Sequence, residues 1–228
     1  MQTAAAESKV ERAQPEIGYL LPPWNVSESV REQFRKVRAM VCPQETTNLS
    51  IAVCSHESGE GVSWVASKLA CAVAEISRNV TLLDASSAHH EVQSEIFGLT
   101  AGRPLPWDTT GRSTVFTSPS AHLTIVSAAR NVEGSRTATD VSLAPVIGQL
   151  RDRGNIVIVD CDPMGSSAQV LQLGKLLDGV LFVVEAERQR REVIGRTLES
   201  LKRARIPIVG VLLNKRKQYI PVSIYRML

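Results

Sequence analysis

A short glycine-containing turn holds the residues whose types and spacing best fit phosphate chemistry. It reads Ser55-His56-Glu57-Ser58-Gly59-Glu60-Gly61-Val62-Ser63 and joins an apolar run to a segment with helical spacing. Glycines let backbone N–H groups converge, and the helix dipole adds positive potential for an anion. A functional phosphate loop places lysine and then serine or threonine directly after its second glycine. Here Ser63 is present, but Val62 stands at the lysine position. The alternative is a tight strand-to-helix connection.

Two aspartates end other apolar runs and add oxygen ligands to this prediction. Asp84 follows the run 80–83, and Asp160 follows the run 156–159. Because ligands bind at the carboxyl ends of parallel strands, both side chains are expected to face the same crevice as Ser63. A hydroxyl and two carboxylates are hard oxygen ligands of the kind that Mg²⁺ prefers. For either aspartate alone, the alternative is a turn residue or a helix cap.

The elements that must position these residues alternate between strand and helix. Continuous apolar runs are typical of strands buried on both faces of a parallel sheet. Helical stretches between them predict crossovers that cover both faces. We therefore expect an α/β fold with a doubly wound, mostly parallel sheet and helices on both faces. The predicted strands are 49–54, 80–83, 123–126, 156–159, 180–184 and 208–213, and the predicted helices are 62–77, 86–97, 139–152, 167–176 and 188–204.

The chain before the first strand predicts a tail and then a helix. Residues 1–24 are expected to form a flexible tail, because their mixed composition ends in a proline-rich stretch. Ser27 or Ser29 is expected to open the helix, since Ser29-Val30-Arg31-Glu32 fits a capping box. Its apolar spacing predicts one buried stripe, formed by Val30, Phe34, Val37 and Met40.

Three longer segments complete the predicted organisation. Residues 25–215 form the nucleotide-binding domain, within which residues 100–121 are rich in Gly, Pro, Thr and Ser and predict a long loop or excursion. Residues 216–228 form a basic tail that contains Tyr219 and Tyr225.

The composition predicts one ordinary globular domain. The chain has 228 residues, 43% of them hydrophobic, which is normal for a soluble protein. Its net charge of +3 is too small to indicate a nucleic-acid partner. No segment approaches the ~18 apolar residues of a membrane span, and no signal-peptide core is present. Cys54 and Cys161 lie in apolar runs and are expected to be buried free thiols. A cytoplasmic location is expected, with any membrane link supplied by a partner.

These motifs resemble those of the bacterial tyrosine kinases, relatives of the MinD and ParA ATPases with a deviant Walker A motif. The resemblance runs from about Glu28 to Arg226. Where the family reads Pro-Gly-Glu-Gly-Lys-Ser/Thr, this chain has Ser58-Gly59-Glu60-Gly61-Val62-Ser63. The family's Asp-Ala-Asp-Leu-Arg corresponds to residues 84–88, which keep the first aspartate and lack the second and the arginine. The Walker B motif matches Ile158-Val159-Asp160-Cys161-Asp162-Pro163.

The resemblance implies a nucleotide site that uses ATP and Mg²⁺. It assigns catalytic roles to Asp84 and Asp160, and it implies that these two residues and Ser63 hold the metal. Nucleotide contacts fall on Gly59, Glu60, Gly61, Val62, Ser63, Trp64 and Asn214, and the asparagine contacts the adenine base.

The resemblance also implies partners. Glu32, Arg35 and Arg38 reproduce a Glu-x-x-Arg-x-x-Arg motif that joins family subunits into rings. The alternative is a solvated helix face with intrahelical pairs. Tyr219 and Tyr225 correspond to tail tyrosines that are phosphorylated in trans, unless the tail packs on the domain. The expected homo-oligomer docks on the cytosolic end of an inner-membrane protein that sets polysaccharide chain length, and therefore lies at the inner face of the membrane.

Val62 decides between three functions. A charge-assisted hydrogen bond contributes about 1.5–3 kcal/mol, and a preorganised charge at the transition state about 2.7–4 kcal/mol. Valine supplies neither, so we expect a degenerate, kinase-like regulator of exopolysaccharide or capsule synthesis. The first alternative is an active tyrosine autokinase in which another cation replaces the lysine. The second is a MinD/ParA-type positioning ATPase, which the ring motif and the missing early lysine, near His56 and Glu57, disfavour.

Overall fold

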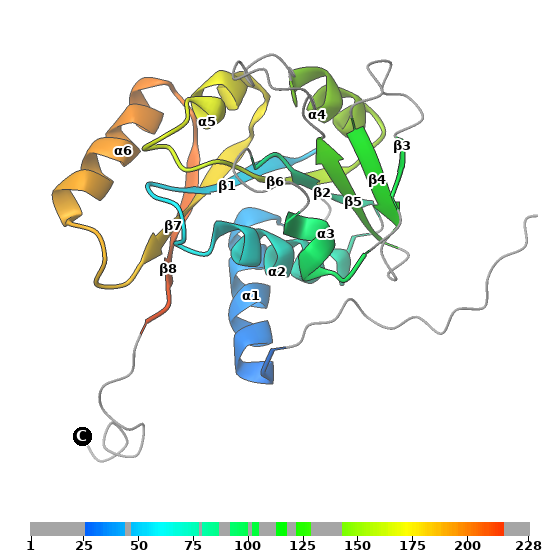
Figure 1. Ribbon diagram of the computed structural model, residues 1–228, viewed down its shortest axis with the longest axis horizontal. Coiled ribbons are helices and arrows are strands. Elements are labelled where there is room, and N and C mark those ends of the chain that lie inside the picture. Colours follow the sequence, from blue (N-terminus) through cyan, green and yellow to red (C-terminus); the bar gives the residue numbers. More distant parts are fainter. Residues whose placement is uncertain are drawn as a thin grey trace, which may run out of the picture.

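The computed structural model describes residues 26–43, 47–77, 79–86, 92–99, 102–104, 113–117, 122–128 and 143–216. Its described strands form one sheet in the order β3-β4-β5-β2-β6-β1-β7-β8 (Figure 1). All pairings from β5 through β8 are parallel, whereas β3 and β4 are antiparallel. The strands are β1 (Ser50–Ser55), β2 (Val80–Asp84), β3 (Arg103–Pro104), β4 (Ser113–Thr117), β5 (Leu123–Ala128), β6 (Ile156–Asp160), β7 (Gly179–Glu185) and β8 (Ile208–Asn214).

Helices cover both faces of the sheet (Figure 1). Alternate residues of each strand point to opposite faces, so Ile51 and Val53 of β1 pack in one core with α1 and α2. Ala52 and Cys54 pack in the other core with α4, α5 and α6. This arrangement confirms the predicted doubly wound α/β fold. The helices are α1 (Glu28–Val41), α2 (Val62–Ala74), α3 (Val92–Ile96), α4 (Leu143–Asp152), α5 (Gln169–Leu173) and α6 (Arg191–Arg203), with a 3-10 turn at Gly174–Leu176.

Helix α1 starts after Ser27, one of the two serines predicted to open it, but it differs from the prediction in its capping box and in its buried stripe. It begins at Glu28 after Ser27, whose side chain makes no capping hydrogen bond. Ser29 therefore lies inside the helix, and the predicted capping box is wrong. Met40 is 68% exposed, whereas Val41 is buried. The buried stripe continues from Phe34 to Val41 because a spacing of seven residues returns the chain to the same helix face.

The segment 100–121 contains strands that the sequence interpretation missed. Within it, β3 and β4 add an antiparallel pair to the edge of β5. These strands form because backbone pairing at an open sheet edge requires little apolar patterning. The predicted helix 86–97 is also corrected, since Ser86 is not helical and α3 begins at Val92. Residues 87–91 lie outside the described part of the chain.

The four cysteines are buried and free, as predicted for Cys54 and Cys161. Burial raises the pKa of Cys54 to about 12, so this thiol stays protonated. Within the described residues no helix has the length and apolar character needed to cross a membrane. The predicted tails, residues 1–24 and most of 216–228 with Tyr219 and Tyr225, lie outside the described residues.

Candidate functional site

The predicted phosphate loop lies between β1 and α2, at the carboxyl edge of the sheet. Val62 is the first residue of α2, and Gly61 precedes it with φ +91°. A Cβ at Gly61 would collide with the side-chain nitrogen of Asn214. Gly59 also has positive φ, +83°. Both glycines are therefore required by the backbone conformation of the loop.

Glu60 holds the loop in shape from within. Its side chain is 1% exposed, and Oε2 accepts the backbone N–H groups of His56 and Glu57, both at 3.0 Å. The other oxygen accepts the N–H of Glu185 at 3.4 Å. A carboxylate that accepts several N–H groups is well compensated for its burial. The described contacts of Glu60 are thus to the protein backbone, while its predicted nucleotide contact stays a prediction.

Basic side chains from two neighbouring strand ends hold the outer side of the loop. Lys215 Nζ donates to the carbonyl oxygen of Gly59 at 2.6 Å and lies 3.2 Å from Glu185 Oε2. Arg188 donates to the carbonyl oxygen of Ser58 at 3.0 Å and to Glu185 at 2.9 Å. The hydrogen bond from Arg188 lowers the pKa of Glu185. These contacts surround the loop with cations, although position 62 carries none.

Asp84 and Asp160 lie side by side, as the sequence predicts, because they are register partners on the adjacent strands β2 and β6. Gln93 of α3 links both of them to the loop. Its Nε2 donates to Asp160 Oδ2 at 2.7 Å and to the carbonyl oxygen of Ser63 at 3.0 Å. Its backbone N–H donates to Asp84 Oδ2 at 3.0 Å. The structure therefore brings the predicted acids and Ser63 together through a residue that the sequence interpretation missed.

Burial strongly perturbs Asp160. The side chain is 1% exposed, and desolvation, followed by repulsion from Asp84, raises its pKa to about 7. Hydrogen bonds from Gln93 and Ser63 act in the opposite direction. A buried carboxylate with such a pKa is disfavoured in its charged form unless a cation joins it, and perturbed acids of this kind cluster at functional sites.

The oxygen atoms at this edge fit a hard cation such as Mg²⁺. Asp160 Oδ1 and Gln93 Oε1 are buried and have no hydrogen-bond partner among the described residues. Such orphaned acceptors are uncommon and call for a ligand or another compensating group. The described chain brings together no group of three His, Cys, Asp or Glu side chains suited to a metal. A cation here would therefore rely on Asp84, Asp160 and the hydroxyl of Ser63, with phosphate or water as further ligands.

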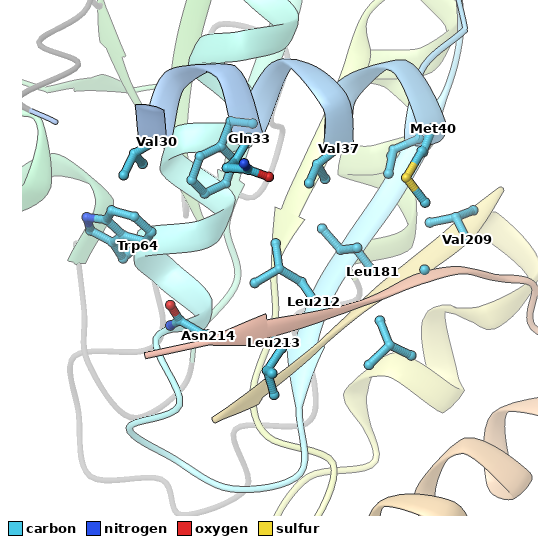
Figure 2. A pocket seen from close by; sticks show the side chains of 14 residues that line it. Val30, Gln33, Val37, Met40, Trp64, Leu181, Val209, Leu212, Leu213 and Asn214 are labelled. Carbon is cyan, nitrogen blue, oxygen red and sulfur yellow. The ribbon is translucent and has the colours of Figure 1, made fainter. Parts of the chain in front are cut away.

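Trp64 and Asn214 lie beside an apolar groove between α1 and β8 (Figure 2). The groove has a volume of about 420 Å³ and is lined mainly by aliphatic side chains. The ring of Trp64 packs edge-on against Phe34, with centroids 5.5 Å apart. Asn214 donates from its side-chain amide to the carbonyl oxygen of Glu60 at 2.8 Å. The predicted nucleotide contacts of both residues stay predictions, and Asn214 has a clear role in holding the loop.

Two of the predicted interface residues, Arg35 and Arg38, contact Glu75 at the C-terminal end of α2 in the same chain. Arg35 pairs with Glu75 at 3.1 Å and with Glu28 at 2.8 Å, and Glu32 lies 3.7 Å from it. Arg38 reaches the same Glu75 at 3.2 Å. Both the intrahelical alternative and a contact to α2 are therefore realised within one chain. A role of these residues between subunits stays a prediction.

Two of the residues that the sequence interpretation missed share one recognisable pattern. Arg188 and Lys215 follow the ends of β7 and β8, at the edge where β2 and β6 end with Asp84 and Asp160. Polar residues just after parallel strands are expected to gather at that edge, so this rule could have found the two cations. Gln93 lies within a helix and carries no such pattern.

Sequence comparison places these features among known proteins. No protein-family model matches the chain. Over 173 residues it is 27% identical to an uncharacterized ATP-binding protein of Methanocaldococcus jannaschii. This alignment covers 73% of this chain and 64% of that protein. Over 202 residues it is 22% identical to the tyrosine-protein kinase CpsD of Streptococcus agalactiae. That alignment covers 83% of this chain and 84% of the kinase.

Solved structures share the fold of this chain. The kinase domain of Escherichia coli tyrosine kinase ETK superposes with a TM-score of 0.70 at 17% identity, covering 94% of this chain and 88% of that one. The resemblance to the bacterial tyrosine kinases is confirmed. The MinD cell division protein of Aquifex aeolicus has a TM-score of 0.54 at 14% identity, covering 78% and 72%. This similarity agrees with a MinD/ParA-like, doubly wound fold.

Proposed function

We propose that this chain is a kinase-like regulatory subunit of bacterial exopolysaccharide or capsule synthesis and export. In this proposal the chain still binds nucleotide but has lost phosphoryl transfer. The observation that carries the proposal is Val62 at the start of α2, within a loop whose other features are kept. Phosphoryl transfer depends on positioning and on positive charge near the moving phosphoryl group. Val62 removes that charge from the position that the family's lysine occupies.

The surroundings of Val62 also support a loss of catalytic activity. The side chain is partly buried and packs against the apolar core beneath α2. It therefore contributes apolar packing where a lysine would reach toward phosphate. The family's second aspartate and arginine are also replaced, by Ser86 and Ala88. These departures concern charge on the phosphate side of the site.

Retained nucleotide and Mg²⁺ binding is supported by the remaining geometry. The loop keeps both left-handed glycines, and the helix that follows directs its N-terminus at the loop. Ser63, Asp84 and Asp160 supply oxygen donors for the cation, which would neutralise the phosphate charge. The relative from Methanocaldococcus jannaschii is named as an ATP-binding protein, which accords with this part of the proposal.

The principal test measures ATP binding and phosphotyrosine in the same sample of purified chain with Mg²⁺. We expect weak nucleotide binding and no transfer to Tyr219 or Tyr225. Val62→Lys should tighten nucleotide binding about 10- to 100-fold, the equivalent of one charge-assisted hydrogen bond. Val62→Met is the matched control, since methionine has similar length without charge, and it should leave affinity unchanged. Phosphotyrosine formed by the parent chain and lost in Asp160→Ala would refute the impaired-kinase proposal.

We also propose that α1 joins subunits and that the assembly docks on the cytosolic end of an inner-membrane polysaccharide chain-length protein. Arg35 and Arg38 keep partial exposure while bound to Glu75, so they remain accessible at the surface. Arg35→Glu should lower the oligomeric state measured by light scattering. Lys36→Glu makes the same charge reversal at an exposed position of the same helix and should not. Equal behaviour of the two variants would remove the interface assignment.

A further inference from the structure

The buried side chain of Gln93 sits at the centre of the predicted cation site. It is fully buried and comes from α3, whereas Ser63, Asp84 and Asp160 come from three other segments. Its backbone N–H is bonded to Asp84, and its side-chain NH₂ bridges Asp160 and the Ser63 carbonyl oxygen. No other described hydrogen bond links these three positions through one residue.

The described contacts of Gln93 leave one half of its amide unused. Nε2 makes both side-chain hydrogen bonds, while Oε1 is buried with no partner among the described residues. The neighbouring Asp160 Oδ1 has none either. Each buried acceptor without a donor is unfavourable. A cation that contacts both oxygens would satisfy them at once, and amide and carboxylate oxygens are suitable ligands for it.

We infer that Gln93 is an additional oxygen ligand of this cation site, directly or through one water, and that its amide nitrogen stands in for the cation when none is bound. The inference rests on the proposed Mg²⁺ site and adds its local control. The amide is nearly symmetric in shape, so a half-turn exchanges the NH₂ donor for the oxygen acceptor. The oxygen facing Asp160 would be repelled without a cation and attracted with one. The NH₂ group, in contrast, donates to Asp160 Oδ2 in this structure.

Two substitutions of Gln93 distinguish a role as a cation ligand from a role in stabilising the fold. Gln93→Glu keeps an oxygen ligand and adds negative charge, but it loses the donor to Asp160. It should therefore bind cation more tightly and unfold more easily without it. Gln93→Met loses both groups at similar length and should weaken binding about 10- to 100-fold, as loss of metal-site partners does. If Gln93 has only a structural role, both variants should show lower cation affinity and lower stability than the parent.

The test uses Mn²⁺ alone as the probe, measured by electron paramagnetic resonance without nucleotide, on the full chain. Glu95→Gln changes charge at an exposed position of the same helix and should leave Mn²⁺ affinity unchanged. Thermal unfolding with and without Mn²⁺ reports whether each variant folds. If Gln93→Met does not fold, the side-chain NH₂ resonance of Gln93 in the parent, assigned by its loss in Gln93→Glu, must shift as Mg²⁺ is added.

The outcomes distinguish this inference from the proposed site itself. Binding in the parent, loss in Asp160→Asn and opposite changes in Gln93→Glu and Gln93→Met would support the inference. Parent-like Mn²⁺ affinity in both Gln93 variants, or an NH₂ resonance that stays fixed while Mg²⁺ binds, would overturn it and leave the site intact. No Mn²⁺ binding by the parent would overturn both the site and the role of Gln93.

Discussion

Replacement of Gly61 by alanine tests whether Asn214 and the left-handed turn together hold the phosphate loop. Gly61 has φ +91°, a conformation that costs an L-residue about 1–2 kcal/mol. The added Cβ also collides with the amide nitrogen of Asn214. That amide must move and lose its 2.8 Å hydrogen bond to the Glu60 carbonyl oxygen, which costs about 0.5–1.5 kcal/mol. We therefore expect Gly61→Ala to lower the free energy of unfolding by about 1.5–3.5 kcal/mol, the sum of the two costs.

Gly98 offers a matched control for the backbone strain. It has φ +64° and no atom within 4 Å of an added Cβ, so Gly98→Ala should cost only about 1–2 kcal/mol. Urea unfolding of both variants measures the difference. The collision is isolated by Asn214→Ala, which should cost about 1 kcal/mol in the parent and nothing further in Gly61→Ala. Equal losses in Gly61→Ala and Gly98→Ala, or additive losses with Asn214→Ala, would refute the reasoning.

Two further predictions concern buried carboxylates. The pKa of Asp160 rises from 3.8 to about 7, so its stability contribution is fully present below pH ~4 and is lost as pH rises through ~7. In urea unfolding without cations, the free energy of unfolding of Asp160→Asn should rise relative to that of the parent as pH increases across that window, by up to about 4 kcal/mol. A gap that does not change with pH would contradict the assigned burial effect. Glu60→Gln should lower the unfolding free energy by about 2 kcal/mol, because one backbone N–H loses its carboxylate acceptor. Glu57→Gln at the exposed rim should change it by under ~1 kcal/mol, and equal melting shifts would argue against the buried role of Glu60.

Local patterns in the sequence carried the prediction of the sheet. Apolar runs of strand length recur between helical stretches, and each strand of the parallel part was expected within a few residues of where it lies. Asp84 and Asp160 were expected at one edge, because both directly follow such runs. Their pairing on β2 and β6 bears this out. The reason is that burial on both faces leaves a continuous apolar signature in the chain itself.

Patterns failed where pairing or capping decided the structure. Strands β3 and β4 join the sheet through backbone pairing to β5, which requires no apolar run. Ser29 matched a capping box by residue type, yet α1 begins one residue earlier in the chain, at Glu28. Residue identity alone could not decide between neighbouring serines, since the cap depends on where the preceding chain departs from the helix.

The sequence by itself determined the strands of the parallel part of the sheet, the glycine loop, the two strand-end aspartates and the valine in place of lysine, because each is encoded within a few neighbouring residues. Tertiary structure alone decided which side chains complete the site. Gln93 reaches Asp160 across 67 residues of sequence, and Lys215 reaches the loop at Gly59 across 156. Such contacts arise from the packing of distant segments at one sheet edge, where burial also raises the pKa of Asp160. Two oxygens there, Asp160 Oδ1 and Gln93 Oε1, have no hydrogen-bond partner within the described part of the chain.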